Sequence, residues 1–482
     1  MTQAEHNCRT MLSPGETTSL YLADRDGAGS EIKCLQPVRV VPNKRASYLA
    51  RWNEKEVFVK LFFDPRHAHR HWCREKERIK ALAARSLLSP TLLHAGAVRD
   101  PKGYVLIVEA LLDADTFVER WRSIISEEER QRLVRILVET LAAQHEAGIL
   151  QQDLHLSNFL ISGSNIYSID AAQMRVSGRA VAKRTALRNL GLLLAQFDPR
   201  YDQYASAVLA NYKAHRRWPV GDHDVPFLRA CVDSAREKRK QKFLAKIFRE
   251  CTAFAVKKAG NVVYVYDKHY SSSGFHKLYS DPDGFFSGHD IQYLKEGNTS
   301  TVVRISVDGT DIVIKRYNIK GVWHGIKRAS RRTRASICWR NAHLLQFYGV
   351  PTPQPVAYIE QRFGPVRRRS YFVCEYVKGT NYREYFADHV VSAESRERIA
   401  QQIAEMLAVL ARYRIKHGDM KATNLIIADS RTYLTDLDAM REYRTALCFH
   451  SAHNQDIKRF LENWTNYQEI RNLFKDKISS LA

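Results

Sequence analysis

Hydrophobic and polar residues repeat one order of patterns in the two halves of this chain. The first half opens with short apolar runs typical of strands, at residues 38–41, 47–52, 57–63 and 103–109. A charged stretch at 72–85 interrupts these runs and has apolar residues at helical spacing. A helix is expected from Ser126 to about residue 146, because Ser126 is a favourable N-cap residue and acidic residues fill the first turn.

The second half has the same order. Its apolar runs lie at residues 293–307, 311–317 and 371–377, and the Asp308-Gly309 pair between the first two is a strong hairpin signal. Helices are expected at residues 337–347 and 392–413. Strands followed by helices, twice over, predict an α+β fold of two bilobal domains in tandem.

Composition places the limits of these domains. Residues 1–35 are expected to be a flexible leader, residues 36–260 a first domain and residues 261–482 a second domain. The boundary is set within the polar, Gly- and Ser-rich stretch from about 257 to 288. Residues 1–30 lack the apolar core of a signal peptide, and the chain has no run of eighteen apolar residues, so a cytoplasmic protein is expected.

A short polar signature follows the last long predicted helix of each half. QQDLHLSN and HGDMKATN both place an Asn five residues after an Asp, and a second Asp follows the first by seventeen residues in both halves. Phosphoryl transfer from a nucleotide needs this set, because one Asp orients the attacking hydroxyl while the Asn and the second Asp hold Mg²⁺ on the phosphates. The spacing predicts two catalytic residues, Asp153 and Asp419, and four Mg²⁺ ligands, Asn158, Asp170, Asn424 and Asp436.

A lysine at the end of an apolar strand supplies each half with a cation for the nucleotide phosphates. VFVK ends at Lys60 and IVIK ends at Lys315. A helix glutamate usually fixes such a lysine, and Glu77 is the expected partner of Lys60, with Glu75 as the second choice. The equivalent helix of the second half has no Glu, so Asn341 is expected to take its place without the charge, and the first copy is expected to be at least as active as the second.

Weaker signals concern the rest of the nucleotide site. Neither half has a G-x-G-x-x-G loop, but EGNTST in the second half offers backbone and hydroxyl donors for phosphate at Gly297, Asn298 and Ser300. Glu109 and Glu375 end apolar strands and are expected to mark the hinge, where backbone groups bind adenine.

Charged residues near the signatures add two further expectations. Lys421, two residues after the catalytic Asp419, is expected to neutralise charge on the transferred phosphoryl group, whereas His155 at the equivalent position does so only when protonated. Asp438 lies two residues after Asp436, where it either adds charge to the metal site or caps the turn.

The net charge of +23 indicates anionic partners. Between Lys315 and Arg340 the sequence has nine Lys or Arg and no acidic residue, and Val322, Trp323 and Ile326 give this segment an apolar edge. A helix over residues 320–340 that binds an anionic membrane surface is therefore expected, with a solvated helix as the alternative. Nucleic acid is not an expected partner, because no nucleic-acid-binding module is recognised.

On these motifs the chain resembles the bacterial lipopolysaccharide core kinases, the heptose and Kdo kinases related to protein kinases. The resemblance covers both halves and rests on VFVKLF, QQDLHLSNFL, IVIKRYN, WRNAH followed by GVPTPQP, HGDMKATNLI, and LTDLDAM. It implies two protein-kinase-like domains in tandem, ATP and Mg²⁺ as cofactors, and a lipopolysaccharide core sugar or glycolipid as phosphate acceptor. It also implies work at the cytosolic face of the inner membrane.

Two other interpretations remain open at this point. One or both copies are pseudokinases that scaffold lipopolysaccharide assembly, which the missing helix Glu of the second copy and the missing His before Asp153 favour. A small-molecule kinase of the aminoglycoside or choline type also shares HGD and a late Asp-x-Asp, but such enzymes usually prefer cationic substrates, which a protein of charge +23 repels.

Overall fold

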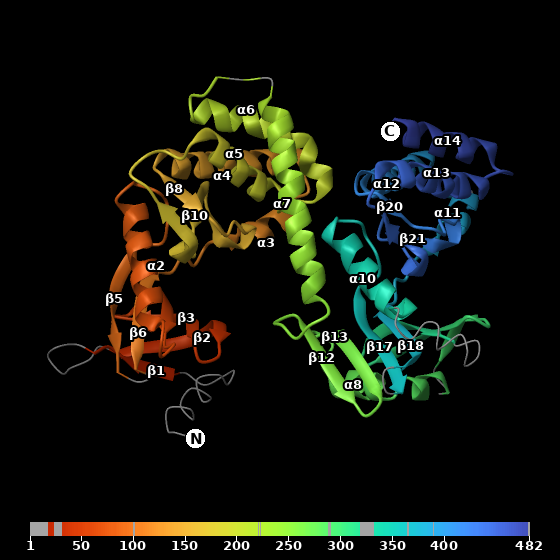
Figure 1. Cartoon of the computed structure of the whole chain (residues 1–482), viewed down its shortest axis with the longest axis horizontal. Coiled ribbons are helices and arrows are strands. Elements are labelled where there is room, and N and C mark those ends of the chain that lie inside the picture. The colour runs from red at the N-terminus through yellow and green to blue at the C-terminus, as the bar shows by residue number, and fades with distance from the viewer. Residues whose placement is uncertain are drawn as a thin grey trace. The chain divides into compact units, whose positions relative to one another are not determined.

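The computed structural model describes residues 18–23, 31–99, 102–219, 221, 223–287, 291–318, 332–363, 366–388 and 390–480. The chain forms two compact units. The first unit comprises Met1–Phe197 and Tyr201–Arg236, and the second unit comprises Asp198–Arg200 and Glu237–Ala482. Figure 1 labels those helices and strands of both units for which there is room.

Within the described residues of the first unit, six strands form an antiparallel sheet in the order β1-β2-β3-β4-β6-β5. They are Thr18–Tyr21 (β1), Glu31–Val41 (β2), Arg45–Trp52 (β3), Lys55–Phe62 (β4), Leu92–Val98 (β5) and Gly103–Glu109 (β6). Helix α2 (Ala68–Ala83) connects β4 to β5 and packs on β6. Alternate residues of β4 are buried in the sheet core, among them Val59 and Leu61, so Lys60 points to the opposite face, toward α2.

The second unit has a larger antiparallel sheet, in which the described strands follow the order β12-β13-β17-β18-β16-β15-β14. They are Phe254–Ala259 (β12), Val262–Asp267 (β13), Gln292–Glu296 (β14), Ser300–Val307 (β15), Thr310–Tyr317 (β16), Pro355–Phe363 (β17) and Val366–Glu375 (β18). Helix α10 (Arg334–Phe347) lies between β16 and β17 in the sequence. Ile312 and Ile314 of β16 are buried in the sheet core, and Lys315 points away from it.

Five strands have the same order in both sheets. The series β2-β3-β4-β6-β5 of the first unit corresponds to β14-β15-β16-β18-β17 of the second, and in both series a helix follows the lysine strand. The first sheet adds β1 beside β2, and the second adds β13 and β12 beside β17. The repeated sequence pattern therefore corresponds to a repeated order of strands.

The remainder of each unit is mostly helical. The helices of the first part of the chain are Phe117–Ser123 (α3), Glu127–Glu146 (α4), Lys183–Leu194 (α5), Ala205–His215 (α6) and Asp224–Lys246 (α7). Those of the second part are Ser273–Ser280 (α8), Tyr382–Ala387 (α11), Ala393–Arg412 (α12), Ala446–Glu462 (α13) and Gln468–Ser479 (α14). The Ser126 hydroxyl accepts a hydrogen bond from the Glu129 N–H, and Ser392 does the same for Ser395, so both long helices α4 and α12 begin at a serine cap.

Short strands and 3₁₀ turns carry the two signatures. The short strands are Asp115–Thr116 (β7), Ile149–Gln151 (β8), Phe159–Ser162 (β9), Asn165–Ser168 (β10), Met174–Val176 (β11), Thr380–Asn381 (β19), Ile415–Lys416 (β20), Leu425–Ala428 (β21), Arg431–Leu434 (β22) and Arg441–Glu442 (β23). The hairpin β9–β10 and the hairpin β21–β22 lie between the first and second Asp of each signature.

The α+β class predicted from the sequence is confirmed, and most predicted elements are present. The limits of the domains differ. Residues 18–21 (β1) and 31–35, the start of β2, belong to the six-stranded sheet, so the expectation of a flexible leader over residues 1–35 is wrong for them. The boundary between the two domains differs as well. The polar stretch 257–288 holds β12 in part, β13 and α8, and β13 pairs with β17, so the predicted limit near residue 260 lies inside the sheet of the second unit. Cross-strand pairing with residues a hundred positions away, which local composition does not report, moves the division to Arg236.

The basic segment 320–340 is described only in part, because residues 319–331 lie outside the described residues. Two of its arginines belong to α10 and are paired: Arg334 contacts Asp438, and Arg340 contacts Glu442. Among the helices of the described residues, none is long and apolar enough to cross a membrane.

The buried histidine of α10 makes the stability of the second unit depend on pH. Burial lowers the pKa of His343 to about 3. Below pH 6.5 this histidine is therefore protonated in the unfolded chain but stays neutral in the folded chain. The stabilisation is complete above pH 6.5 and decreases as the pH falls from there, by up to about 1.4 kcal/mol per pH unit. His343→Phe keeps a ring between Trp339 and Phe254 and removes the titration, so its free energy of urea unfolding should fall less between about pH 7 and pH 5 than that of wild type.

The matched control is His450→Phe on the exposed face of α13, which should keep the wild-type pH dependence. Equal slopes for wild type and His343→Phe would contradict the assignment.

Candidate active sites

In each unit, one backbone hydrogen bond joins the two predicted metal ligands. The Ile169 N–H donates to the Asn158 carbonyl (2.9 Å), which brings the next residue, Asp170, beside Asn158. The Thr435 N–H donates to the Asn424 carbonyl over the same distance and places Asp436 in the same way. The hairpins β9–β10 and β21–β22 make this contact possible, because each returns the chain to the point where it began.

The second Asp of each signature has a left-handed backbone. Asp170 has φ 58° and Asp436 has φ 59°, and each precedes a 3₁₀ turn, Ala171–Gln173 (η2) or Leu437–Ala439 (η6). Residues other than glycine rarely adopt this conformation, although Asp and Asn tolerate it better than most. Such strain is typical of functional positions, where surrounding structure holds it in place.

The predicted ligands fit a hard cation. Asn158 donates its amide N–H to the Asp153 carbonyl (3.1 Å), and Asn424 donates to the Asp419 carbonyl (2.8 Å). With the amide nitrogen engaged, the amide oxygen remains for a cation, next to the carboxylate of the second Asp. No group of three or more His, Cys, Asp or Glu suited to a metal occurs in the described part of the chain. An Asn and an Asp that leave further positions to substrate phosphates match the way proteins hold Mg²⁺.

Lys60 pairs with Glu75, and not with Glu77 as the sequence analysis preferred. The Lys60 ammonium contacts the Glu75 carboxylate and lies 3.8 Å from Asp170 Oδ1. Glu75 is buried on the same face of α2 as Ile79, four residues on, whereas the Glu77 side chain is 59% exposed and lies near Lys76. Helical spacing decides this: two residues further along the helix, a side chain points about 200° away.

Lys315 pairs with carboxylates from the turn after the signature, and not with Asn341. Its ammonium contacts Asp436 Oδ1 and lies 3.4 Å from Asp438 Oδ2. The Asn341 amide instead donates to the Leu437 and Met440 carbonyls (2.9 and 3.0 Å), so it holds the η6 turn rather than the lysine.

The Lys315–Asp436 pair is ionised. Burial acts to lower the pKa of Lys315, but Asp436, Cys338 and Asp438 together raise it above its ordinary value. Burial acts to raise the pKa of Asp436, but the adjacent lysine lowers it overall. The Lys315 ammonium and the Asp436 carboxylate are therefore both charged at neutral pH.

The two predicted catalytic carboxylates have different surroundings. The Asp153 side chain is 60% exposed, and His155 Nε2 lies 3.1 Å from its carboxylate. The Asp419 side chain is 25% exposed and lies between two cations, Lys421 Nζ at 3.3 Å and Arg459 Nη2 at 2.6 Å. Arg459 comes from α13, and the sequence analysis did not identify it, because it lies forty residues from the signature.

A buried carboxylate supports the loop before Asp419. Asp456 on α13 accepts the backbone N–H groups of His417 (2.6 Å) and Gly418 (3.0 Å), and the His417 ring bonds the Thr435 carbonyl at 2.9 Å. Gly418 has φ 87°, and a Cβ there would lie 2.9 Å from the Ala439 carbonyl oxygen, so the loop packs closely on the η6 turn. The sequence held one signal that was not used: Asp456 interrupts an otherwise apolar helix face.

The first unit supports its loop with neutral groups. Asn189 on α5 donates to the Gln151 carbonyl (2.7 Å), and the Gln151 amide donates to Gln144 (2.9 Å), which in turn bonds Ser168. His145 contacts Asn189 at 3.0 Å, and burial lowers the pKa of His145 to about 4, so this network is neutral. Different residues thus hold equivalent loops in the two units.

The predicted hinge glutamates have structural partners. Glu109 ends β6 and accepts the Thr91 hydroxyl (2.8 Å), and Glu375 ends β18 and accepts the Tyr270 hydroxyl (2.7 Å). Their side chains are therefore occupied by the protein, and so is the backbone N–H of Tyr376, which donates to the Asp311 carbonyl (2.9 Å).

The loop between β14 and β15 holds the predicted phosphate donors of the second unit. The Asn318 amide donates to the Gly297 carbonyl (3.2 Å) and ties this loop to the end of the lysine strand. Asn298 is exposed, but Ser300 is buried where β15 pairs with β16. The Ser300 hydroxyl therefore does not lie at the loop surface with the other two predicted donors.

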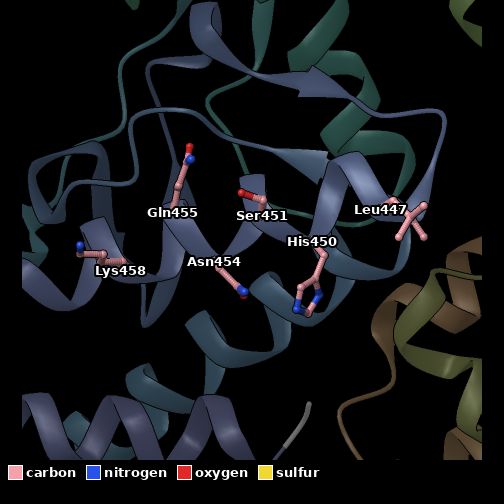
Figure 2. Close-up of a pocket in the computed structure, with 7 residues that line it drawn as sticks. Leu447, His450, Ser451, Asn454, Gln455 and Lys458 are labelled. Carbon is pink, nitrogen blue, oxygen red and sulfur yellow. The ribbon is translucent and has the colours of Figure 1, made fainter.

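A separate surface hollow of 740 Å³ lies along the outer face of α13. Figure 2 shows its lining side chains, which all come from this helix: Ala446, Leu447, His450, Ser451, Asn454, Gln455 and Lys458. None of the predicted catalytic, metal or lysine residues lines it, so this hollow is not the nucleotide site.

The geometry of the second unit coincides with a family match. Residues 286–473 match the Lipopolysaccharide kinase (Kdo/WaaP) family. The matched region includes the lysine strand β16, the signature loop and α13, which confirms the predicted resemblance for this part of the chain. That family implies a lipopolysaccharide kinase, and hence ATP and a divalent metal. No curated protein matches the chain.

The Asp456 support is expected to be essential for the stability of the second unit. Asp456→Asn removes a charged acceptor of two backbone N–H groups, so we expect a loss of about 1–3 kcal/mol in the free energy of unfolding. Asp476→Asn, at an exposed position on α14, is the matched control and should change stability little. Denaturant unfolding followed by intrinsic fluorescence measures both, and an effect no larger than that of the control would contradict this role.

Proposed function

We propose that this protein is an ATP-dependent kinase that transfers the γ-phosphate to a sugar hydroxyl of the lipopolysaccharide inner core. The observation that carries the proposal is the coincidence of the family match with the second unit, where Lys315, Asp419, Asn424 and Asp436 come together. The alternative of a small-molecule kinase lacks such a match.

In the proposed reaction each residue has one task. Lys315 binds the donor phosphates, and Asn424 and Asp436 hold Mg²⁺, whose charge offsets that of the phosphates. Asp419 orients the sugar hydroxyl and takes its proton as the new oxygen–phosphorus bond forms. The bond from γ-phosphorus to the bridging oxygen breaks, and ADP leaves with the electron pair. Lys421 and Arg459 fix the direction of the Asp419 carboxylate.

We propose the same assignment for the first unit, with Lys60, Glu75, Asp153, Asn158 and Asp170. The support is the repeated order of strands and the repeated joining of the Asn to the second Asp. The earlier reason to rank the first copy above the second no longer holds, because Lys315 has carboxylate partners of its own.

A second candidate function for the first unit is that of a nucleotide-binding pseudokinase. Gln151 and Gln152 stand where the second unit has His417 and Gly418, and the family match begins only at residue 286. If this unit is catalytic, replacing Asp153 should lower phosphate transfer. If it is a scaffold, the same replacement should leave phosphate transfer unchanged.

Phosphate transfer from labelled ATP to purified core oligosaccharide tests the proposal. Asp419→Asn should lower turnover on the order of 10²-fold or more, because the hydroxyl loses its orienting base. Asp153→Asn is the matched variant: a similar loss assigns catalysis to both units, and no loss assigns the first unit to the pseudokinase class. Wild type that transfers no phosphate to any core acceptor would refute the proposal.

Nucleotide binding is tested separately by thermal melting. Asp436→Ala and Asp170→Ala should each remove the stabilisation by ATP and Mg²⁺ of their own unit, because an uncompensated phosphate charge remains. Neither variant should alter melting without nucleotide as strongly as it alters the shift. A wild-type protein with no shift in either unit would contradict the assignment of both sites.

We further propose that the anionic inner-membrane surface, where the acceptor glycolipid lies, is a partner, because net charge +23 favours it. Replacing Lys327, Arg328 and Arg331 with Gln should weaken binding to vesicles that contain anionic lipid, by about 1 kcal/mol per charge. This set leaves Arg334 in its contact with Asp438. Activity on a soluble core oligosaccharide should persist. If vesicle sedimentation shows unchanged binding, the three basic residues serve a partner other than the membrane.

A further inference from the structure

Asp438 lies where the second unit needs a partner for its lysine. In the first unit, Glu75 on α2 holds Lys60. Helix α10 of the second unit contains no Asp or Glu. Its Cys338 Sγ lies 3.0 Å from the hydroxyl of Tyr317, and the Lys315 ammonium lies over the ring of this tyrosine at 5.2 Å. The carboxylates that do contact Lys315 come from the η6 turn.

The contacts of Asp438 fit neither role that the sequence left open. Its side chain is 9% exposed, and Oδ2 contacts both the Arg334 guanidinium and, at 3.4 Å, the Lys315 ammonium. A carboxylate taken up by two cations does not add to a metal site. Nor does it cap the turn, because the groups that bond this turn are the Asn341 amide and the backbone.

Each copy lacks the carboxylate that the other copy places beside its lysine. Asp438 follows Asp436 by two residues, and the residue two after Asp170 is Ala172. The first copy therefore has a helix carboxylate and no turn carboxylate, whereas the second has a turn carboxylate and no helix carboxylate. One carboxylate besides the metal ligand is available to each lysine.

We propose that Asp438 is the positioning residue of Lys315, in place of the helix glutamate. This rests on the proposed function, in which Lys315 binds the donor phosphates. With Asp436 serving as a ligand of Mg²⁺, the ammonium would lose its nearest partner, and Asp438 would keep it directed at the phosphates. Arg334, in the first turn of α10 and stacked on Tyr317 at 4.7 Å, holds Asp438 in turn.

The surroundings of α10 support this division of tasks. The Trp339 indole donates to the Ile247 carbonyl at the end of α7 (3.0 Å), and Arg340 shares Glu442 with Lys240. These contacts fix the helix without any bond to Lys315. The lysine of the second unit is thus contacted by the turn that carries the predicted metal ligand. Helix α10 acts on the lysine only through that turn, by Arg334 on Asp438 and by Asn341 on the carbonyl groups of the turn.

The test uses the full chain with Asp170→Ala, which silences nucleotide binding by the first unit. In that background Asp438→Asn should raise the Kd of ATP–Mg²⁺ or lower kcat by about 10- to 100-fold, as expected for loss of a charged hydrogen-bond partner. The KM of the acceptor and the melting temperature without nucleotide should change little. Glu75→Gln in an Asp436→Ala background is the matched variant of the first unit and should give the same pattern.

Moving the carboxylate from the turn to the helix, or from the helix to the turn, distinguishes a role in positioning the lysine from a role in stabilising the fold. Cys338→Glu should restore nucleotide affinity to Asp438→Ala, and Ala172→Asp should restore it to Glu75→Gln. Wild-type affinity and turnover in Asp438→Asn would overturn the inference and leave the proposed function intact, as would a loss confined to nucleotide-free melting. If the parent with Asp170→Ala binds no ATP, and Lys315→Ala changes nothing, the proposed function of the second unit fails and this inference fails with it.

Discussion

A lysine ammonium in a largely enclosed position must be paired with a carboxylate, and this requirement links the sheet, the helix and the turn in each unit. Lys60 and Lys315 both leave the sheet on the face away from its core. An unpaired charge there costs several kcal/mol, so a partner has to come from another element. Glu75 supplies it from α2, and Asp436 and Asp438 supply it from the η6 turn. The strand that carries the lysine is thereby fixed relative to the turn that carries the predicted metal ligand.

The left-handed Asp is the second constraint, and it depends on the first. Asp170 and Asp436 direct their carboxylates toward the lysine because the backbone reverses there, and the bond from the preceding residue to the signature Asn keeps it reversed. Residues of other elements support each 3₁₀ turn. In the second unit the Asn341 amide donates to the turn, and in the first unit the Gln152 N–H donates to the Gln173 carbonyl. Strain at one residue is held by bonds to its neighbours.

Spacing along the chain predicted the features that are local. The succession of strands and helices along the chain and the long helices α4 and α12 follow from short-range patterns. The order of strands within each sheet and the hydrogen bond beside each second Asp were not predicted. Pairings between distant residues were not predictable in the same way. Glu75 and Glu77 differ only in which helix face they occupy. The carboxylate partners of Lys315 come from the η6 turn and not from the helix, so the position of Asn341 on the helix did not predict its role. Asp456 and Arg459 reach the signature loop from α13, and no local pattern reports such contacts.

The two copies also show how a missing motif residue should be judged. The second unit lacks a helix glutamate, but Asp438 contacts its lysine. The first unit lacks the histidine and the aspartate that hold the other loop, but Asn189, Gln151 and Gln144 form a neutral network in their place. Absence of these supporting residues is therefore weak evidence for a pseudokinase, because neighbouring groups take over a supporting role. The predicted catalytic Asp and the predicted Asn–Asp ligand pair differ in kind, since a base and cation ligands act through their own atoms and a group elsewhere does not replace them. Both units keep those three residues at the same spacing. Each unit therefore retains the residues that neighbouring groups do not replace.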